Sequence, residues 1–242
     1  MCSGPIAGEA IATLARARPD VDLVVVFGAI HTPLQTDLAA FDTHRRWSVP
    51  GGESEIPVGL ERKLTESSDL FVTDERFHRF EHAVEVELPL IQLAWPDANV
   101  LPVEVPVTDD AVEIGQRVAR QIEREGLTAV YLASSDLTHY GPDYRFTPAG
   151  VGLEALEWAK QNDARVLARV LNMQPETIVP EVRAHYNACG AGAIAAMMSA
   201  SIAVGATKAH VLRHANSYEM LLGVAPGHEP DNAVGYAGVV VG

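Results

Sequence analysis

Short runs of consecutive apolar residues recur along the chain, separated by segments whose apolar residues lie at helical spacing. The runs over residues 22–27 (DLVVVF), 100–107 and 128–133 (TAVYLA) are typical of strands covered on both faces of a sheet. Helical spacing predicts helices over residues 5–17, 58–66, 81–95, 109–125, 152–173, 175–183 and 190–204. The alternation predicts an α/β fold, a three-layer α/β/α sandwich with a mostly parallel central sheet.

Residues that begin and end helices refine this outline. Thr108 is predicted to cap the helix over residues 109–125, and Gly126 to end it. Pro89 is expected to kink or shorten its helix, because proline lacks the backbone N–H that an interior turn needs. Residues 32–57 are rich in proline and glycine and are predicted to be mostly loop. Closing strands are predicted over residues 209–214 and 234–241, and the pattern leaves the direction of the last one open.

The composition excludes several classes of function. The chain has 242 residues, enough for one large domain, and neither a linker-like segment nor an internal repeat divides it. Lys and Arg number 18 against 32 Asp and Glu, which gives a net charge of −14. Because such a surface repels phosphate backbones and anionic lipids, we expect neither a nucleic acid nor a membrane as partner.

The cysteines and the N-terminus indicate the compartment. The two cysteines, Cys2 and Cys189, cannot form a disulfide framework, and the N-terminus lacks the regions of a signal peptide. We therefore expect a cytoplasmic protein. Residues 186–207 carry no formal charge and are long enough to span a bilayer, but they are mostly Ala, Gly and Ser. Such small residues allow close packing, so we predict a buried core helix there.

Four polar elements lie where chemistry is expected in an open α/β sheet, beyond strand ends or at the start of a helix. His31 follows the first strand in the sequence GAIH, and the segment SSDLTHYG, residues 134–141, follows the third. Cys189 precedes the small-residue helix, whose dipole favours a thiolate. His82 lies in EHAVE, where the helix over residues 81–95 is predicted to begin.

Each element has a structural explanation when it is taken alone. His31 and His82 can be structural histidines, with the carboxylates around His82 forming a solvated helix start, and Cys189 can be an inert core thiol. Together the elements supply two imidazoles, a soft ligand and His139, which Asp136 can orient from three residues away. Such a set can hold a divalent metal ion with open coordination positions.

These residues, in their order along the chain, resemble the Memo family, also known as AmmeMemoRadiSam system protein B. The motifs are the histidine of GAIH, EHAVEVELP, SSDLTHYG and the Cys189–Gly190 pair; HANSYE near Asn216 and the final VGYAGVVV also fit. The resemblance covers nearly the whole chain. The family in turn resembles the class III extradiol dioxygenases, whose catalytic subunit uses non-haem Fe(II). The resemblance therefore implies a dioxygenase-like fold and a single Memo-like domain over residues 1–242.

Carried over residue by residue, the resemblance implies that His31, His82 and Cys189 line a metal site. Asp136 and His139 would take the acid/base roles. The implied metal is Fe(II), with zinc or copper as alternatives. The dioxygenases have a carboxylate as the third ligand, whereas this chain has a cysteine, which counts against ring cleavage.

Two further departures from the family pattern concern the first strands. Members usually have GPSH where this chain has GAIH, so the histidine is kept. Members usually begin with a strand and a PHAGY-type motif ahead of a segment such as YSGPVAGEAY, whereas this chain starts at MCSGPIAGEA. We expect either a misassigned start codon or a sheet that lacks this strand. A missing strand would expose apolar surface and an unpaired edge, and would remove a wall of the pocket.

The leading hypothesis is a non-haem iron oxidoreductase of the class III extradiol dioxygenase type, in which His139 moves a proton. A second hypothesis is a binding or adaptor protein whose pocket captures a peptide or small ligand without turnover. A third is a metal-assisted hydrolase that activates water with zinc, and a fourth is nucleophilic catalysis by Cys189 with His139. The sequence gives neither the substrate nor the oligomeric state.

Overall fold

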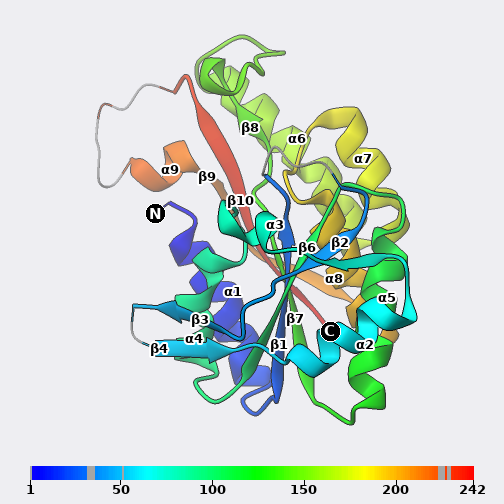
Figure 1. The fold of residues 1–242 in the computed structure, drawn as a ribbon. Helices are drawn as coiled ribbons and strands as arrows, with labels where there is room; N and C mark the ends of the chain where they lie inside the picture. The colour runs from blue at the N-terminus through cyan, green and yellow to red at the C-terminus, as the bar shows by residue number, and fades with distance from the viewer. Residues whose placement is uncertain (1, 32–35, 51, 223–226, 228–229) are drawn as a thin grey trace.

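The computed structural model of the chain describes residues 2–31, 36–50, 52–222, 227 and 230–242, with the backbone alone at residues 58, 77 and 78. Figure 1 shows the elements. In chain order they are α1 (Gly4–Ala17), β1 (Leu23–Ala29), β2 (Ala39–Phe41), β3 (Arg46–Val49), β4 (Gly52–Glu55), α2 (Val58–Ser67), β5 (Phe71–Thr73), α3 (Glu75–Arg79), η1 (Glu85–Glu87), α4 (Leu88–Ala94), β6 (Asn99–Val105), α5 (Ala111–Arg124), β7 (Ala129–Ser134), β8 (His139–Tyr140), η2 (Pro142–Tyr144), α6 (Leu153–Leu171), η3 (Pro175–Thr177), α7 (Ile178–His185), α8 (Ala191–Ala203), β9 (Ala209–Asn216), α9 (Ser217–Leu221) and β10 (Ala233–Val241).

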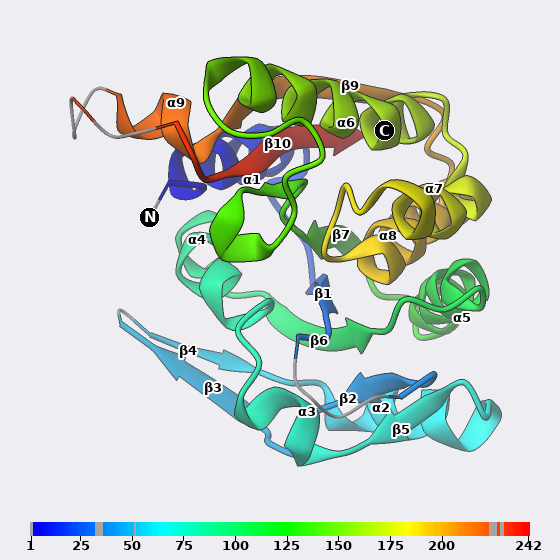
Figure 2. The ribbon, with the colours of Figure 1, turned by 90° about the horizontal axis from the view of Figure 1, so that it is seen from above.

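The central sheet has the strand order β5-β2-β6-β1-β7. β1 pairs in parallel with β6 on one side and β7 on the other, and β2 pairs in parallel with β5. The single antiparallel pairing joins β2 to β6 at Ala40 and Glu104. Helices lie on both faces of this sheet (Figure 2). The predicted α/β architecture with a mostly parallel central sheet is confirmed.

The apolar run of β1 follows from its position in the middle of this sheet. Side chains alternate between the two faces of a strand, and both faces of β1 are covered. Val24 and Val26 pack in a cluster with residues of α1 and α4. Leu23, Val25 and Phe27 pack on the opposite face with residues of α5 and α8. An alternating polar pattern would therefore bury polar groups.

A second sheet, with the order β8-β10-β9, lies beyond β7. β10 runs antiparallel to β9 over most of its length, which settles the direction that the sequence left open. The two sheets are joined next to the end of β7. The Leu137 N–H donates to the Gly235 carbonyl at 2.8 Å, and the Gly235 N–H donates to the Thr138 carbonyl at 2.9 Å. These two hydrogen bonds fix one end of β10 against the first sheet.

The small-residue segment forms α8, which is almost entirely buried, as predicted. α8 packs against α5, where a Cβ at Gly115 would overlap the carbonyl oxygen of Ala196. The two helices approach this closely because both contribute small residues. None of the helices in the described part of the chain combines the length and the hydropathy that crossing a bilayer requires.

Several predicted boundaries are wrong. α5 begins at Ala111 with Asp110 as its N-cap, so Thr108 does not cap it; its hydroxyl accepts the Asp110 N–H within the preceding loop. Residues 81–84 are not helical, because the proline at 89 occupies the first turn of α4 and the helix starts there. Residues 32–57 hold three strands in their described part, and residues 32–35 and 51 lie outside it. β2 is three residues long, too short to show a periodic pattern.

Candidate functional site

The polar elements predicted from the sequence meet at the carboxyl ends of β1 and β7. His31 follows β1, Asp136 and His139 follow β7, and Cys189 precedes α8. His82 lies in the irregular segment between α3 and η1. All five side chains line one cavity of about 1410 Å³.

His31 and His82 lie side by side, because the segment that carries His82 packs directly on the end of β1. A Cβ at Gly28 would lie 2.9 Å from a methyl group of Val84, so the glycine lets this segment approach. The two imidazole rings stack with their centroids 4.9 Å apart and an angle of 22° between their planes. One ligand atom each from His31, His82 and Glu81 lies within 4.8 Å of the other two.

Glu81 organises this pair of histidines. Its side chain is 1% exposed, and its Oε1 lies 2.9 Å from Nδ1 of His31 and 3.4 Å from Nδ1 of His82. The carboxylate also accepts the backbone N–H groups of His31, His82 and Ala83. Burial works to raise the pKa of Glu81, but the hydrogen bonds from His31, His82 and Ala83 outweigh it and lower the pKa to about 2. Glu81 is thus an ionised anchor whose oxygens are already occupied.

This role of Glu81 was not predicted from the sequence, where the residue was interpreted as part of a solvated helix start. The available signal is a carboxylate placed immediately before the histidine, where free backbone N–H groups need an acceptor. Because Glu81 holds Nδ1 of His31, Nε2 is the ring nitrogen that can bind a metal ion once its proton is displaced. The neighbouring carboxylate therefore selects the tautomer that can bind a metal ion.

Cys189 lies against the backbone that follows β7, where its N–H donates to the Asp136 carbonyl at 3.1 Å. Its sulfur accepts the backbone N–H of Asp136 at 3.2 Å and lies 3.7 Å from the Ser135 hydroxyl. Burial works to raise the pKa of Cys189, but hydrogen bonding to His139 and then to His31 lowers it to about 6. The predicted thiolate thus has two imidazole partners in addition to the start of α8.

His139 is paired with Asp136, as predicted. Its Nε2 lies 3.5 Å from Oδ2 of Asp136, and its ring lies 5.0 Å from the ring of Tyr144. Hydrogen bonding to Asp136, and next to Cys189, raises the pKa of His139 to about 9. Hydrogen bonding to Cys189, and next to Glu81, raises the pKa of His31 to about 10.

The ionisable side chains of the site therefore influence one another's charge. The lowered pKa of Cys189 and the raised pKa values of His31 and His139 favour a thiolate with protonated imidazoles as its neighbours. His82 contacts this group of side chains through its ring, which stacks on the ring of His31. The structure brings the five predicted residues together, while the assignment of His31, His82 and Cys189 as metal ligands stays a prediction.

The donor set fits a divalent transition metal ion. Imidazole nitrogens suit iron, zinc, copper and nickel, and a thiolate adds a soft anionic ligand. Glu81 is poorly placed as a further ligand, since its oxygens already accept hydrogen bonds from backbone and side chain. Among the described residues, the ligand atoms that lie within 4.8 Å of one another are those of His31, Glu81 and His82, and Cys189 lies outside this group.

The chain as a whole is similar to proteins of one family. A family model described as "Memo-like protein" matches residues 1–240. A MEMO1 family protein of Methanosarcina mazei is 33% identical to the chain, over 100% of the chain and 82% of its own length. A MEMO1 family protein of Pyrococcus furiosus is 29% identical over 91% of the chain and 76% of its own length. The crystal structure of an uncharacterized protein from Escherichia coli K12 has a TM-score of 0.56 and covers 95% of the chain and 91% of its own. At 15% identity this last likeness shows the fold alone.

Proposed function

The chain belongs to the Memo-like protein family, and from this premise we propose that it binds a divalent metal ion, Fe(II) above all, at His31, His82 and Cys189. We further propose that it acts as an oxidoreductase of the class III extradiol dioxygenase type. The observation that carries the proposal is the position of His31, which stacks on His82 at 4.9 Å and lines the same cavity as Cys189. Two nitrogens and a sulfur thus face one cavity.

The chain's own residues prepare the site for such an ion. When bound, iron would supply Lewis-acid and redox chemistry. Glu81 fixes the ring orientation and tautomer of His31 through Nδ1. Asp136 orients His139, whose pKa of about 9 keeps it protonated at neutral pH, so that it can donate a proton to a substrate in the cavity. The adjoining cavity receives that substrate, whose chemical class is left open.

Metal occupancy tests the proposal directly. His31→Ala and His82→Ala should each reduce bound iron to a small fraction of one ion per chain, because each removes one imidazole of a small donor set. The measurement is elemental analysis of protein purified anaerobically, loaded with Fe(II) and freed of unbound metal. His210→Ala, which removes an exposed histidine of β9, is the matched control and should keep the occupancy of the unaltered protein. Full stoichiometric iron in both His31→Ala and His82→Ala would refute the site.

A second candidate function is nucleophilic catalysis by Cys189. The observation that favours it is the order of groups, with a low-pKa thiol against His139 and Asp136 behind the imidazole. A nucleophile, a base and an orienting carboxylate in this order can act without a metal ion. The two functions separate in one measurement. Fe(II) protects Cys189 from alkylation if the thiolate is a ligand, whereas it leaves the alkylation rate unchanged if the thiol acts alone.

A further inference from the structure

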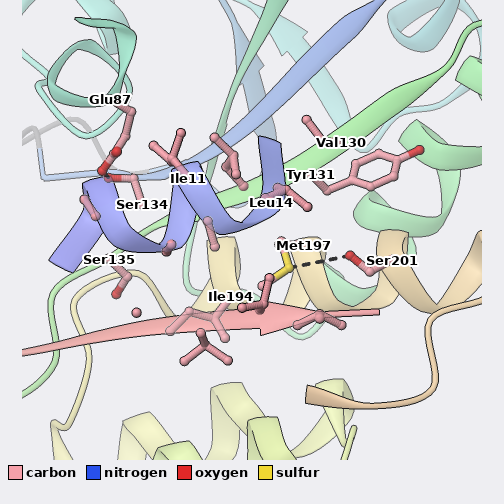
Figure 3. Close-up of a pocket in the computed structure, with 18 of the residues that line it drawn as sticks. Ile11, Leu14, Glu87, Val130, Tyr131, Ser134, Ser135, Ile194, Met197 and Ser201 are labelled. Atoms are coloured by element: carbon pink, nitrogen blue, oxygen red, sulfur yellow. Dashed lines mark hydrogen bonds between the residues drawn. The ribbon is translucent and has the colours of Figure 1, made fainter. Parts of the chain in front are cut away.

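A carboxyl group that the proposed function does not use faces the cavity of the candidate site. It belongs to Glu87, in the short helix η1, and both Glu87 and Ser134, the last residue of β7, line this cavity. Their side chains point toward each other (Figure 3), and the Ser134 hydroxyl donates to Oε1 of Glu87 at 3.4 Å. We call Glu87 and Ser134 the carboxyl subsite.

The carboxyl group of Glu87 has few hydrogen-bond donors around it. Within the described part of the chain, the Ser134 hydroxyl is its only hydrogen-bond partner. A carboxylate can accept about four hydrogen bonds, so most of this capacity is unused. Glu81 differs in this respect, because backbone and side-chain donors already occupy its oxygens. Glu87 therefore offers the cavity an acceptor that a ligand can use.

The surroundings of Glu87 disfavour a negative charge that has no partner. Burial raises the pKa of Glu87, and the charge of Asp136 adds to this effect. The other two carboxylates of the site have cationic neighbours, since Asp136 lies 3.5 Å from His139 and Glu81 lies 2.9 Å from His31. Among the described residues, no side chain forms an ion pair with Glu87. A ligand that carries a positive charge would supply the missing partner.

The chemistry of the subsite favours an ammonium group over other cations. In the described residues, the ligand atoms that lie within 4.8 Å of one another come from His31, Glu81 and His82, so Glu87 lacks the neighbours that a metal ion needs. A planar guanidinium group pairs best with both oxygens of a carboxylate, but Oε1 of Glu87 already accepts the Ser134 hydroxyl. An ammonium group has three diverging donors and needs only single acceptors.

We propose that Glu87 and Ser134 bind the ammonium group of a primary amine, which makes the ligand of this cavity a molecule with a protonated amino group. Oε2 of Glu87 would accept one N–H of the ligand, and the hydroxyl oxygen of Ser134 would accept another. The inference rests on the cavity of the proposed function and names the class of its substrate. Binding at the subsite itself requires no metal ion.

Titration of the full-length, metal-free protein with two probes tests the subsite. The probes are n-butylammonium and n-butanol, which share an alkyl chain and differ in charge. Two-dimensional NMR follows the backbone amides of Glu87 and Ser134 and gives a dissociation constant for each probe. We expect n-butylammonium to bind about tenfold more tightly than n-butanol, or better, because hydrogen bonds between charged groups are stronger than neutral ones.

Two glutamates of the same short helix provide matched substitutions. Glu87→Gln keeps the shape of the side chain and removes its charge, so it should abolish the preference for n-butylammonium. Glu85→Gln removes the same charge from an exposed side chain that does not line the cavity, and it should leave the preference unchanged. In the unaltered protein, a nuclear Overhauser effect from the methylene next to the probe's nitrogen to the Glu87 side chain locates the probe, whether or not Glu87→Gln folds.

Several results would overturn the inference. They are equal affinities for the two probes, a preference that Glu87→Gln retains, and an Overhauser effect that places the probe away from Glu87. A preference that Glu85→Gln also abolishes would assign the effect to net charge and would likewise overturn it.

Iron occupancy separates this inference from the proposed function. Glu87→Gln should bind as much Fe(II) as the unaltered protein, because Glu87 is not a proposed ligand of the metal. If the unaltered protein binds no iron while n-butylammonium binds at Glu87, the proposed function fails and the subsite stands. If iron binds and n-butylammonium shows no preference over n-butanol, the subsite fails and the metal site stands.

Discussion

At the scale of single residues, the site depends on His31 having a different partner on each side. Glu81 holds Nδ1 of its ring, and Cys189 faces it from the cavity. Each contact favours the protonated imidazole in the metal-free protein. A metal ion that takes His31 as a ligand must therefore displace a proton, so metal affinity should rise with pH over the neutral range.

Alkylation of Cys189 tests the charge network. In a Cys2→Ala background, the rate of reaction with iodoacetamide should rise as pH increases through about 6, where the thiol loses its proton, rather than near the ordinary value of 9.0. His139→Ala and His31→Ala each remove a hydrogen bond that lowers the pKa of Cys189, so each should move the midpoint upward. The measurement is the second-order rate constant from pH 4 to 9.

The contrary outcome is equally clear. Slow alkylation at every pH, in the unaltered protein and in both histidine variants, would identify Cys189 as an inert core thiol. His210→Ala serves again as the control, and its profile should match that of the background protein. If the pH midpoint of alkylation rises in the two histidine variants and not in this control, the lowered pKa of Cys189 is due to His31 and His139.

The sequence predicted which residues form the site better than it predicted the contacts between them. His31, His82, Asp136, His139 and Cys189 stand out because strand ends and motifs mark them. Pairing of Asp136 with His139 is local in sequence and was predicted from the spacing of three residues. The anchoring of His31 by Glu81 spans 50 residues and depends on how the loop before η1 packs on β1. No local pattern encodes that contact.

At the scale of elements, the contact between α5 and α8 determines how closely the outer helical layer packs. Gly115 of α5 lies against the backbone of α8 at Ala196. A helical glycine is usually unfavourable, because it has more conformational freedom to lose than alanine. Its presence here indicates that the close approach contributes more to stability than the glycine costs.

Gly115→Ala should lower the free energy of unfolding by at least about 1 kcal/mol. Overpacking of this kind costs roughly 1–3 kcal/mol, which outweighs the gain of about 1 kcal/mol in helix propensity. Gly59→Ala in α2 is the matched control, since a Cβ there meets nothing within 4 Å. That variant should be neutral or more stable by about 0.5 kcal/mol. Urea unfolding of both variants compares them, and equal stabilities would contradict the packing argument.

The strands and helices that the sequence predicted well are the long ones with strong patterns. β1 and β7 appear as unbroken apolar runs, and α8 as an uncharged stretch of small residues. β2 and β5 escaped prediction because each has three residues, and β2 enters the sheet through pairing with distant strands. The start of α4 was misjudged because Pro89 fits a first helical turn as well as it disrupts an interior one.

At the scale of the whole molecule, the central sheet and the sheet of β8, β10 and β9 are joined at Gly235 and separated farther along β7 and β10 by the cavity. Composition and periodicity describe the strands that are present and carry no signal for the space between them. The facing edges of β7 and β10 appear only when the chain is folded.

Hydrogen exchange should distinguish the amides of β1, in the middle of the central sheet, from those of β7 at its edge. In β1, which has neighbours on both sides, amides along the whole strand should exchange slowly. In β7, the amides that bond to β1 should be slow and the alternate amides, which point away from β1, fast. NMR-detected exchange resolves the two sets. Uniformly slow exchange along β7 would contradict an open edge.

The junction between the two sheets lies next to the charged site. Leu137 and Thr138, which hold Gly235, directly follow Asp136, whose backbone N–H bonds the Cys189 sulfur. A ligand in the cavity that shifts β10 relative to β7 would therefore also shift this N–H. By thermodynamic reciprocity, the factor by which such a ligand changes the affinity for a metal ion equals the factor by which the metal ion changes the affinity for the ligand. The junction therefore links the position of β10 to the backbone N–H that bonds the Cys189 sulfur.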